Sequence, residues 1–190
     1  MKDSLRAVWR WVKWPVFVVV VAYAVLVIWR VFVLFDEDKT AAAVADIHAQ
    51  KITLADVEGK NLPPVPDKAE NDATVAGIDK NSNGIRDDVE LAIFEKYSSD
   101  KKSRAAALQY AMAEQMYLTE VFNTETWKAV AEETGRAGLC LLDSTVDWEE
   151  LQNLVSNTSL RKETRTKAFE FITSHGSAGG TPCDISSQQL

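Results

Sequence analysis

Histidine and cysteine are scarce in this sequence, which contains only two of each. His48 and His175 lie far apart, and neither is accompanied by Cys, His or carboxylate residues at the spacing of a zinc site. The chain also lacks a glycine-rich phosphate-binding motif, and its 21 basic residues are outnumbered by 28 acidic ones. These absences disfavour zinc catalysis, phosphate-loop nucleotide binding and nucleic acid as a partner, because nucleic acid requires a basic surface.

One long apolar run lies near the N-terminus. Residues Trp14 to Phe35 are apolar except for Arg30, and a helix of that length can cross a hydrocarbon core of about 30 Å. We therefore predict that residues 1–35 form a cytoplasmic basic segment and an uncleaved transmembrane anchor. The alternative is a signal peptide cleaved near residues 41–43, all alanine, but its apolar core would be only about 7 to 15 residues long.

The charges on the two sides of this run differ in sign. A positive flank normally stays in the cytoplasm, so the body of the protein is predicted to lie on the other side, in the periplasm. We expect a single-pass protein of the inner membrane, with membrane lipid as a partner of the anchor. The flanking charges are Lys2, Arg6, Arg10 and Lys13 before the run, and Asp36, Glu37 and Asp38 after it.

The chain after residue 35 is more acidic and falls into two parts. Five of the basic residues but only one acidic residue lie in residues 1–35, so the remainder has a formal charge of about −11. Residues 36–78 lack helical periodicity and include the proline-rich run Leu62–Asp67, which predicts an extended linker. Residues 79–190 contain four to five short amphipathic segments with polar joins, which predict a small exported all-α domain.

Cys140 and Cys183 are predicted to form a disulfide, because an even number of cysteines in an exported domain favours pairing. Two buried, reduced thiols are the alternative. The disulfide would close a loop of about forty residues, and on the chain-entropy model this contributes roughly 4 kcal/mol to stability. It would tie the C-terminal segment to the helical body.

Residues 79–90 have the pattern of a calcium-binding loop. Side chains that carry oxygen occupy positions 1, 3, 5, 9 and 12, and Gly84 occupies position 6, where a sharp turn is required. Calcium takes six to eight oxygen ligands, and position 7 can supply a backbone carbonyl. We predict a Ca²⁺ site whose ligands are Asp79, Asn81, Asn83, the carbonyl of Ile85, Asp87 and Glu90.

This run resembles the EF-hand loop, the shortened calcium loops of thrombospondin type 3 repeats and the loop-plus-helix units of dockerins. The resemblance covers about residues 79–97, half of one such unit, and Arg86 stands where the EF-hand has an apolar residue. It implies calcium held at positions 1, 3, 5 and 12 and by the carbonyl at 7, with position 9 binding directly or through water. The longer run Val75–Glu90 resembles segments of bacterial envelope proteins of no assigned activity.

A turn that caps the following helix without metal is the alternative to calcium, since Asn- and Asp-rich runs favour turns and N-caps. With three carboxylates and two amides, the site is expected to be weak, with a Kd of about 10⁻⁴ to 10⁻³ M. We expect calcium to act as a structural staple, and a regulatory calcium is the alternative. The predicted function is binding, in a structural or protein-interaction role, with another envelope protein as partner.

A hydrolase of envelope polymers is the alternative function. Its acid and base would be a carboxylate pair, for which Glu132-Glu133 and Glu149-Glu150 are candidates. Adjacent carboxylates on helix faces are ordinarily solvated, so we predict no catalytic residue and no enzyme.

Overall fold

The computed structural model describes residues 2–174, 176 and 181–190, and their side chains from Trp14 onward except that of Phe32. These residues form eight α-helices, one short 3₁₀-helix and no strand, so the all-α class is confirmed. The chain divides into two compact units, Met1–Ala42 and Ala43–Leu190. His175 and the side chains of the basic N-terminal residues lie outside the described part.

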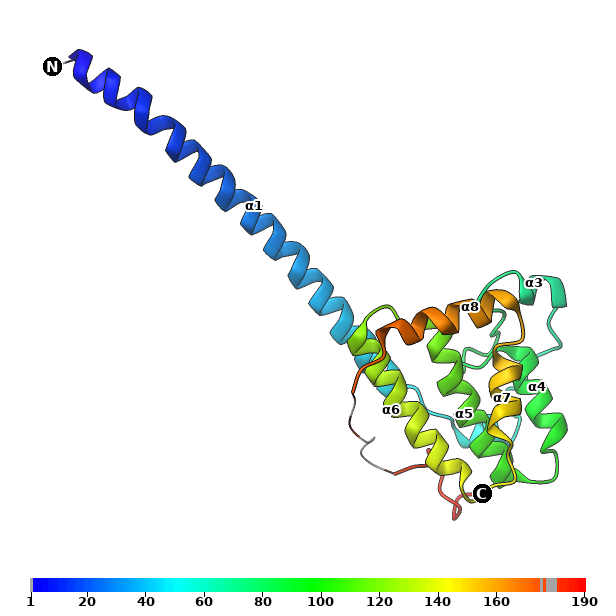
Figure 1. Ribbon diagram of the computed structural model, residues 1–190. Helices are drawn as coiled ribbons and strands as arrows, with labels where there is room; N and C mark the ends of the chain where they lie inside the picture. Colours follow the sequence, from blue (N-terminus) through cyan, green and yellow to red (C-terminus); the bar gives the residue numbers. More distant parts are fainter. Residues whose placement is uncertain (1, 175, 177–180) are drawn as a thin grey trace. The chain divides into compact units, whose positions relative to one another are not determined.

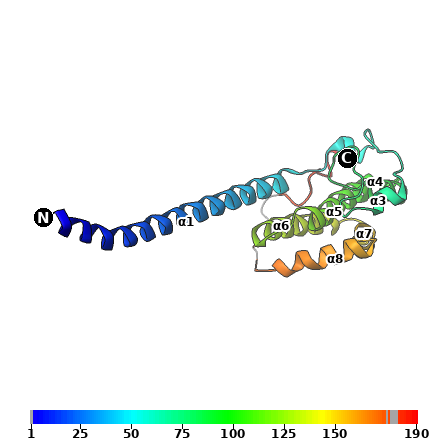
Figure 2. The ribbon, with the colours of Figure 1, turned by 90° about the horizontal axis from the view of Figure 1, so that it is seen from above.

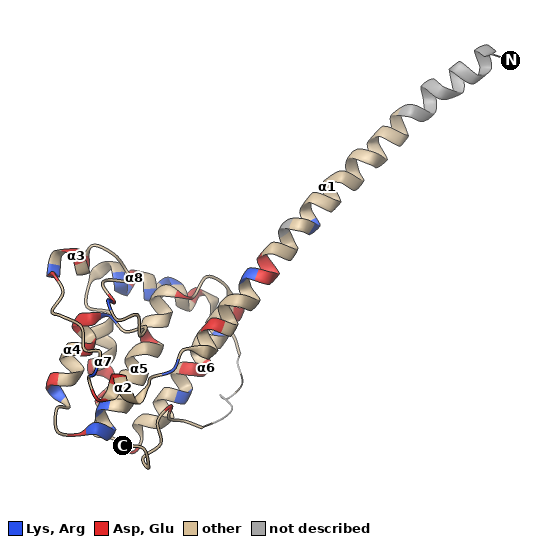
Figure 3. Cartoon of the chain, turned by 180° about the vertical axis from the view of Figure 1, so that it is seen from behind, with Lys and Arg blue, Asp and Glu red and all other residues tan. Residues whose placement is uncertain are grey.

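The first helix, α1 (Lys2–Ala49), contains the predicted apolar run. It is the one helix among the described residues that is long and apolar enough to cross a membrane. Its large apolar side chains are exposed along the run, from Trp14 at 66% to Phe35 at 68%. Figure 3 shows the described part of this stretch almost entirely in tan, the colour of residues other than Lys, Arg, Asp and Glu, and red and blue positions follow it along the helix.

The prediction of an extended linker over residues 36–78 is wrong for much of its length. Helix α1 continues to Ala49, and the linker also contains α2 (Leu54–Val57) and α3 (Lys68–Asp72). Three consecutive alanines are strong helix formers, and Ile47 is fully buried in the domain core, which gives this last part of α1 a packed face. The proline-rich run is non-helical as predicted.

Five helices follow residue 79, in agreement with the predicted four to five. Four of them begin at a side-chain cap, where Asp100, Asn123, Asp147 and Thr158 accept hydrogen bonds from backbone N–H groups of the first turn. The helices are α4 (Asp87–Lys96), α5 (Lys101–Thr119), α6 (Thr124–Leu141), α7 (Trp148–Val155) and α8 (Ser159–Ala168), and the 3₁₀-helix η1 (Phe169–Phe171) continues α8.

Helix α5 is the centre of the domain. Its residues from Ser103 to Leu118 are all buried, and α4, α6, α7 and α8 pack around it (Figure 1). Small side chains at Ala105, Ala106 and Ala107 permit close approach of the neighbouring helices. In the view from above, α8 lies beside α5 and α6 (Figure 2).

Two fully buried arginines attach irregular segments to the helices. Arg161 on α8 donates hydrogen bonds to the backbone carbonyls of Asn71, Thr74 and Val75, which belong to the segment after the prolines. Arg86 donates to the carbonyls of Leu154 and Val155 at the end of α7, at 3.1 and 2.9 Å. These contacts satisfy carbonyls that a helix end or a loop leaves without a partner. Arg161 holds the segment before the predicted calcium loop, and Arg86 attaches the loop itself to α7.

Candidate metal centre

The predicted calcium loop is a tight turn that leads into α4. The Asp87 N–H donates to the Ile78 carbonyl at 2.8 Å, and the Lys80 N–H donates to Asp87 Oδ1 at 3.0 Å, so the two ends of the loop meet. Within the loop, the Asp79 carboxylate accepts from the N–H groups of Asn83 at 3.3 Å and Gly84 at 2.9 Å. Side-chain oxygens thus organise the backbone around the start of the loop.

Two glycines are required by this geometry. Gly84 has φ +81°, as the predicted sharp turn demands, and a Cβ atom there would lie 2.8 Å from Gln50 Oε1. Gly77 has φ +68°, and a Cβ atom there would lie 2.1 Å from the Cδ atom of Arg86. The second contact explains why glycine precedes the loop, since the buried Arg86 side chain passes over it.

The loop is anchored to the core one position earlier than in the EF-hand pattern. Ile85 is 1% exposed and belongs to the hydrophobic core, while Arg86 points to the end of α7 as described above. The apolar residue at position 7 therefore packs the loop against the core, and the arginine at position 8 attaches it to α7.

The structure brings the third and twelfth loop positions into contact. Asn81 Nδ2 donates to Glu90 Oε2 at 2.9 Å and to the Asn61 carbonyl at 3.1 Å, and Asn83 Oδ1 accepts from the Ile85 N–H at 2.9 Å. Among the described residues, Asn81 Oδ1, Asn83 Nδ2 and Asp87 Oδ2 are buried without a hydrogen-bond partner. Such atoms are costly, and two of these three are oxygens at predicted ligand positions.

The carboxylates of the loop are in an unfavourable electrostatic environment. The pKa of Glu90 is raised to about 7, mainly by burial and to a smaller extent by the charges of Asp56 and Asp87, against the lowering effect of the hydrogen bond from Asn81. Burial also raises the pKa of Asp87, as does the charge of Asp79, against the hydrogen bond from Lys80. In the described part of the chain, none of Asp79, Asp87 and Glu90 forms an ion pair.

A polar cavity of about 640 Å³ adjoins the loop. Its walls come from the loop and from the segment that joins α1 to the proline-rich run, a segment in which sequence reasoning finds no site residue. The Thr53-x-x-Asp56 capping pattern is visible in the sequence, but nothing in it indicates a contact with residues 79–90. The lining includes Asp79, Asn81 and Asn83 on one side and Gln50, Lys51, Asp56 and Asn61 on the other.

The six predicted ligands are not gathered into a metal cluster. Within the described residues, no group of three or more His, Cys, Asp or Glu side chains is placed to hold a metal ion. The donor set is entirely oxygen, and buried oxygens without partners are present, so the residues fit a hard cation by chemistry. The calcium site stays a prediction.

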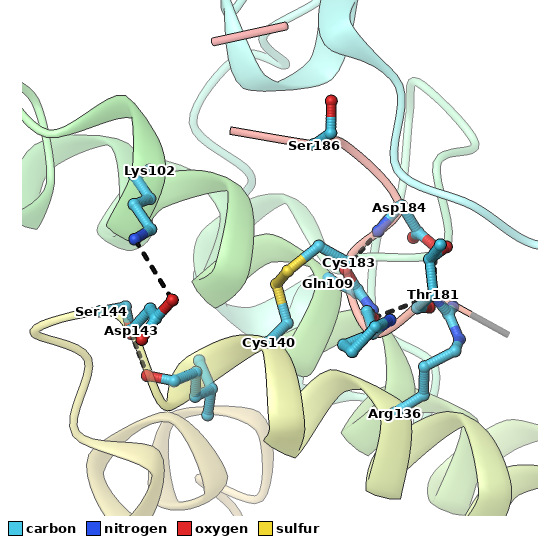
Figure 4. Close-up of a disulfide and its surroundings, with 12 residues drawn as sticks. Lys102, Gln109, Arg136, Cys140, Asp143, Ser144, Thr181, Cys183, Asp184 and Ser186 are labelled. Carbon is cyan, nitrogen blue, oxygen red and sulfur yellow. Dashed lines mark hydrogen bonds and ion pairs between the residues drawn. A yellow bond between two sulfur atoms is a disulfide. The ribbon is translucent and has the colours of Figure 1, made fainter. Parts of the chain in front are cut away.

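The predicted disulfide between Cys140 and Cys183 is present (Figure 4). It joins α6 to the C-terminal segment, where Asp184 is 2.6 Å from Arg136 Nη1 and accepts from the Ile52 N–H at 3.0 Å. Arg136 Nη2 also contacts Glu133, at 2.6 Å. We call the group of Cys140, Cys183, Asp184, Arg136 and Glu133 the C-terminal clasp.

One carboxylate of each pair considered for hydrolysis is paired with basic side chains. Glu133 contacts His48 and Lys51, each at 2.9 Å, in addition to Arg136. Burial raises the pKa of Glu133, but these hydrogen bonds outweigh burial and lower it overall. Glu150 on α7 pairs with Lys96 on α4. A general acid needs a raised pKa, so Glu133 has the opposite property.

Comparison with known proteins adds no relative to these observations. No protein-family model, no curated protein and no solved structure matches this chain. The assignment of the site therefore depends on its own residues.

Proposed function

We propose that this chain is a membrane-anchored, exported protein whose helical domain binds one Ca²⁺ in the loop 79–90, in a structural or protein-interaction role. The observation that carries the proposal is the pair of buried oxygens without partners, Asn81 Oδ1 and Asp87 Oδ2, inside a loop of calcium-loop pattern. A bound divalent cation would give these oxygens and the Glu90 carboxylate the positive partner that the described residues do not provide.

The anchor is supported by the apolar, exposed side chains of α1 over residues 14–35 and by the opposite charges that flank them. Export of the domain is supported by the disulfide, because disulfides persist in oxidising compartments. The expected arrangement has the N-terminus in the cytoplasm and residues 43–190 in the periplasm.

The part of this proposal that concerns a partner protein is supported by exposed apolar side chains where α6 is followed by α7. Leu139, Leu142 and Trp148 are 53%, 78% and 49% exposed. Exposed apolar side chains of this size are candidates for contacts with another protein. The calcium ion would then hold the domain in one conformation rather than take part in chemistry.

The test uses the full chain purified in detergent micelles, after the anchor has been checked by its resistance to alkaline extraction from membranes. Thermal unfolding is measured with 1 mM Ca²⁺ and with chelator. For a Kd near 0.1 mM, mass action adds about 1.4 kcal/mol, which raises the Tm by about 3 to 6 °C. Glu90→Gln should abolish this rise, because it removes a carboxylate ligand.

Glu95→Gln is the matched control, since Glu95 is an exposed residue of the same helix. It should keep the full rise. Equal Tm values with calcium and with chelator in the unaltered protein would show that the loop is a helix cap that binds no metal. Extraction of the chain from membranes at alkaline pH would show that the transmembrane anchor is wrong.

A further inference from the structure

The segment 50–61 forms one wall of the cavity beside the loop, and the loop forms the other. A direct hydrogen bond already connects the two walls, from Asn81 Nδ2 to the Asn61 carbonyl. Gln50, the residue after the end of α1, lies so close that a side chain at position 84 would meet it. Any cation in this loop would thus be faced by residues from outside the loop.

Asp56 is the acidic residue of this second wall. Its side chain is held in place, because Oδ2 accepts from the Thr53 N–H at 2.8 Å and from Thr53 Oγ1 at 2.6 Å. Asp56 is only 8% exposed, and its Oδ1 accepts no hydrogen bond from the described residues. The capping box at the start of α2 therefore fixes a carboxylate with one oxygen left for another partner.

Two geometric observations place this carboxylate at the loop site. Asp56 lines the same cavity as Asp79, Asn81 and Asn83 of the loop. Asp87 is fully buried, and while its Oδ1 faces the Lys80 N–H inside the loop, its Oδ2 has no partner. The one cation among the described residues that line the cavity is Lys51, and its ammonium is paired with Glu133 at 2.9 Å.

We infer that Asp56 supplies a fourth carboxylate to the calcium site, so that one ion joins the loop 79–90 to the segment 53–61. The inference rests on the proposed function, and it makes the site part of two chain segments rather than a loop alone. It also gives the ion a structural role, because the ion would fasten α2, and through Gln50 the end of α1, to the start of α4.

Calcium titration by calorimetry on the full chain in micelles tests this assignment, with Asp56→Asn as the variant. Asparagine keeps an oxygen for Thr53, so the cap of α2 is retained while the negative charge is lost. We expect the calcium Kd to rise about 10- to 100-fold, the range found for groups that support a metal site.

Thr53→Ala is the matched control, since it removes the hydroxyl from the cap and leaves the Asp56 carboxylate. It should lower the Tm equally with calcium and with chelator, and keep the calcium Kd within about twofold. If the unaltered protein binds calcium and Asp56→Asn leaves the Kd unchanged, Asp56 is not part of the site. The same holds if both variants weaken binding equally, and in either case the proposed function is unaffected. Absence of calcium binding in the unaltered protein would overturn the proposed function and this inference together.

Discussion

The C-terminal clasp and the loop 79–90 both use buried carboxylates to join segments that are distant in the sequence, but they differ in their cations. In the clasp, Asp184 and Glu133 lie 2.6 Å from nitrogens of Arg136, and Lys51 adds a second cation to Glu133. In the loop, Asp87 and Glu90 are just as buried and have no ion pair among the described residues. In the part of the chain that the structure describes, the clasp carboxylates are paired with cations, and Asp87 and Glu90 are not.

Because of this difference, the stability of the clasp should be independent of calcium and of mild changes in pH, and the stability of the loop should depend on both. A buried carboxylate paired with arginine is stable over a wide pH range, because arginine does not lose its proton. A buried carboxylate without a cation must take up a proton or bind a metal ion. The clasp should therefore be insensitive to calcium and to mild changes of pH, while the loop should respond to both.

Removal of the clasp cation should have the largest effect. Arg136→Met leaves Asp184 and Glu133 buried with fewer partners, and we expect a loss of about 3 to 5 kcal/mol in the free energy of unfolding. The loss should be the same in calcium and in chelator when measured by denaturant unfolding in micelles. Lys128→Met, which breaks the exposed Lys128–Glu125 pair, is the control and should change stability by less than about 1 kcal/mol.

A smaller loss for Arg136→Met, or one that appears only in chelator, would mean that the clasp does not depend on its own cation. The proposed difference between the clasp and the loop would then be wrong for the clasp.

The pH dependence of stability in chelator should be the next largest effect, and it comes from Glu90. The folded protein keeps Glu90 protonated up to about pH 7, while the unfolded chain releases this proton near pH 4.5. The folded state binds more protons in this window, so the free energy of unfolding should fall by up to about 3 kcal/mol as pH rises from 4.5 to 7. Asp56 and Asp87 face Glu90 and favour the protonated form.

Calcium should flatten this profile, because the ion stabilises the ionised carboxylate. Glu90→Gln should reduce the slope in chelator as well, since the main titrating group is gone and only the smaller contribution of Asp87 is left. The clasp does not interfere, because the lowered pKa of Glu133 confines its effect to pH values below about 4.5. A profile in chelator that is level between pH 4.5 and 7, or that rises, would contradict the electrostatic account of the loop.

Local sequence patterns predicted the local features of this protein, and long-range contacts decided the rest. The turn at Gly84 follows from the pattern of the loop, and the disulfide follows from the cysteine count. The helical part of the supposed linker depends on Ile47 reaching the core, and periodicity over a few residues does not reveal this.

The same limit applies to the candidate site. Asp56 lies 23 residues before Asp79, and its place beside the loop results from the packing of the segment 50–61. Arg86, which departs from the EF-hand pattern, is explained only by the α7 carbonyls it binds. Charges that a fold brings together from separate segments carry no signal in a single sequence.

The same substitution at the two sites should give effects of opposite sign, and this is the smallest and sharpest test of the comparison. Asp184→Asn weakens charge-assisted hydrogen bonds and should cost about 1.5 to 3 kcal/mol in calcium or chelator. Asp87→Asn removes a buried charge that has no cation, so in chelator it should stabilise the protein by about 1 kcal/mol. In 1 mM calcium this gain should be offset, because a ligand is lost and with it about 1.4 kcal/mol of stabilisation from binding. Denaturant unfolding of both variants under both conditions gives four values, and destabilisation by Asp87→Asn in chelator would show that the loop carboxylate already has a stabilising partner within the protein.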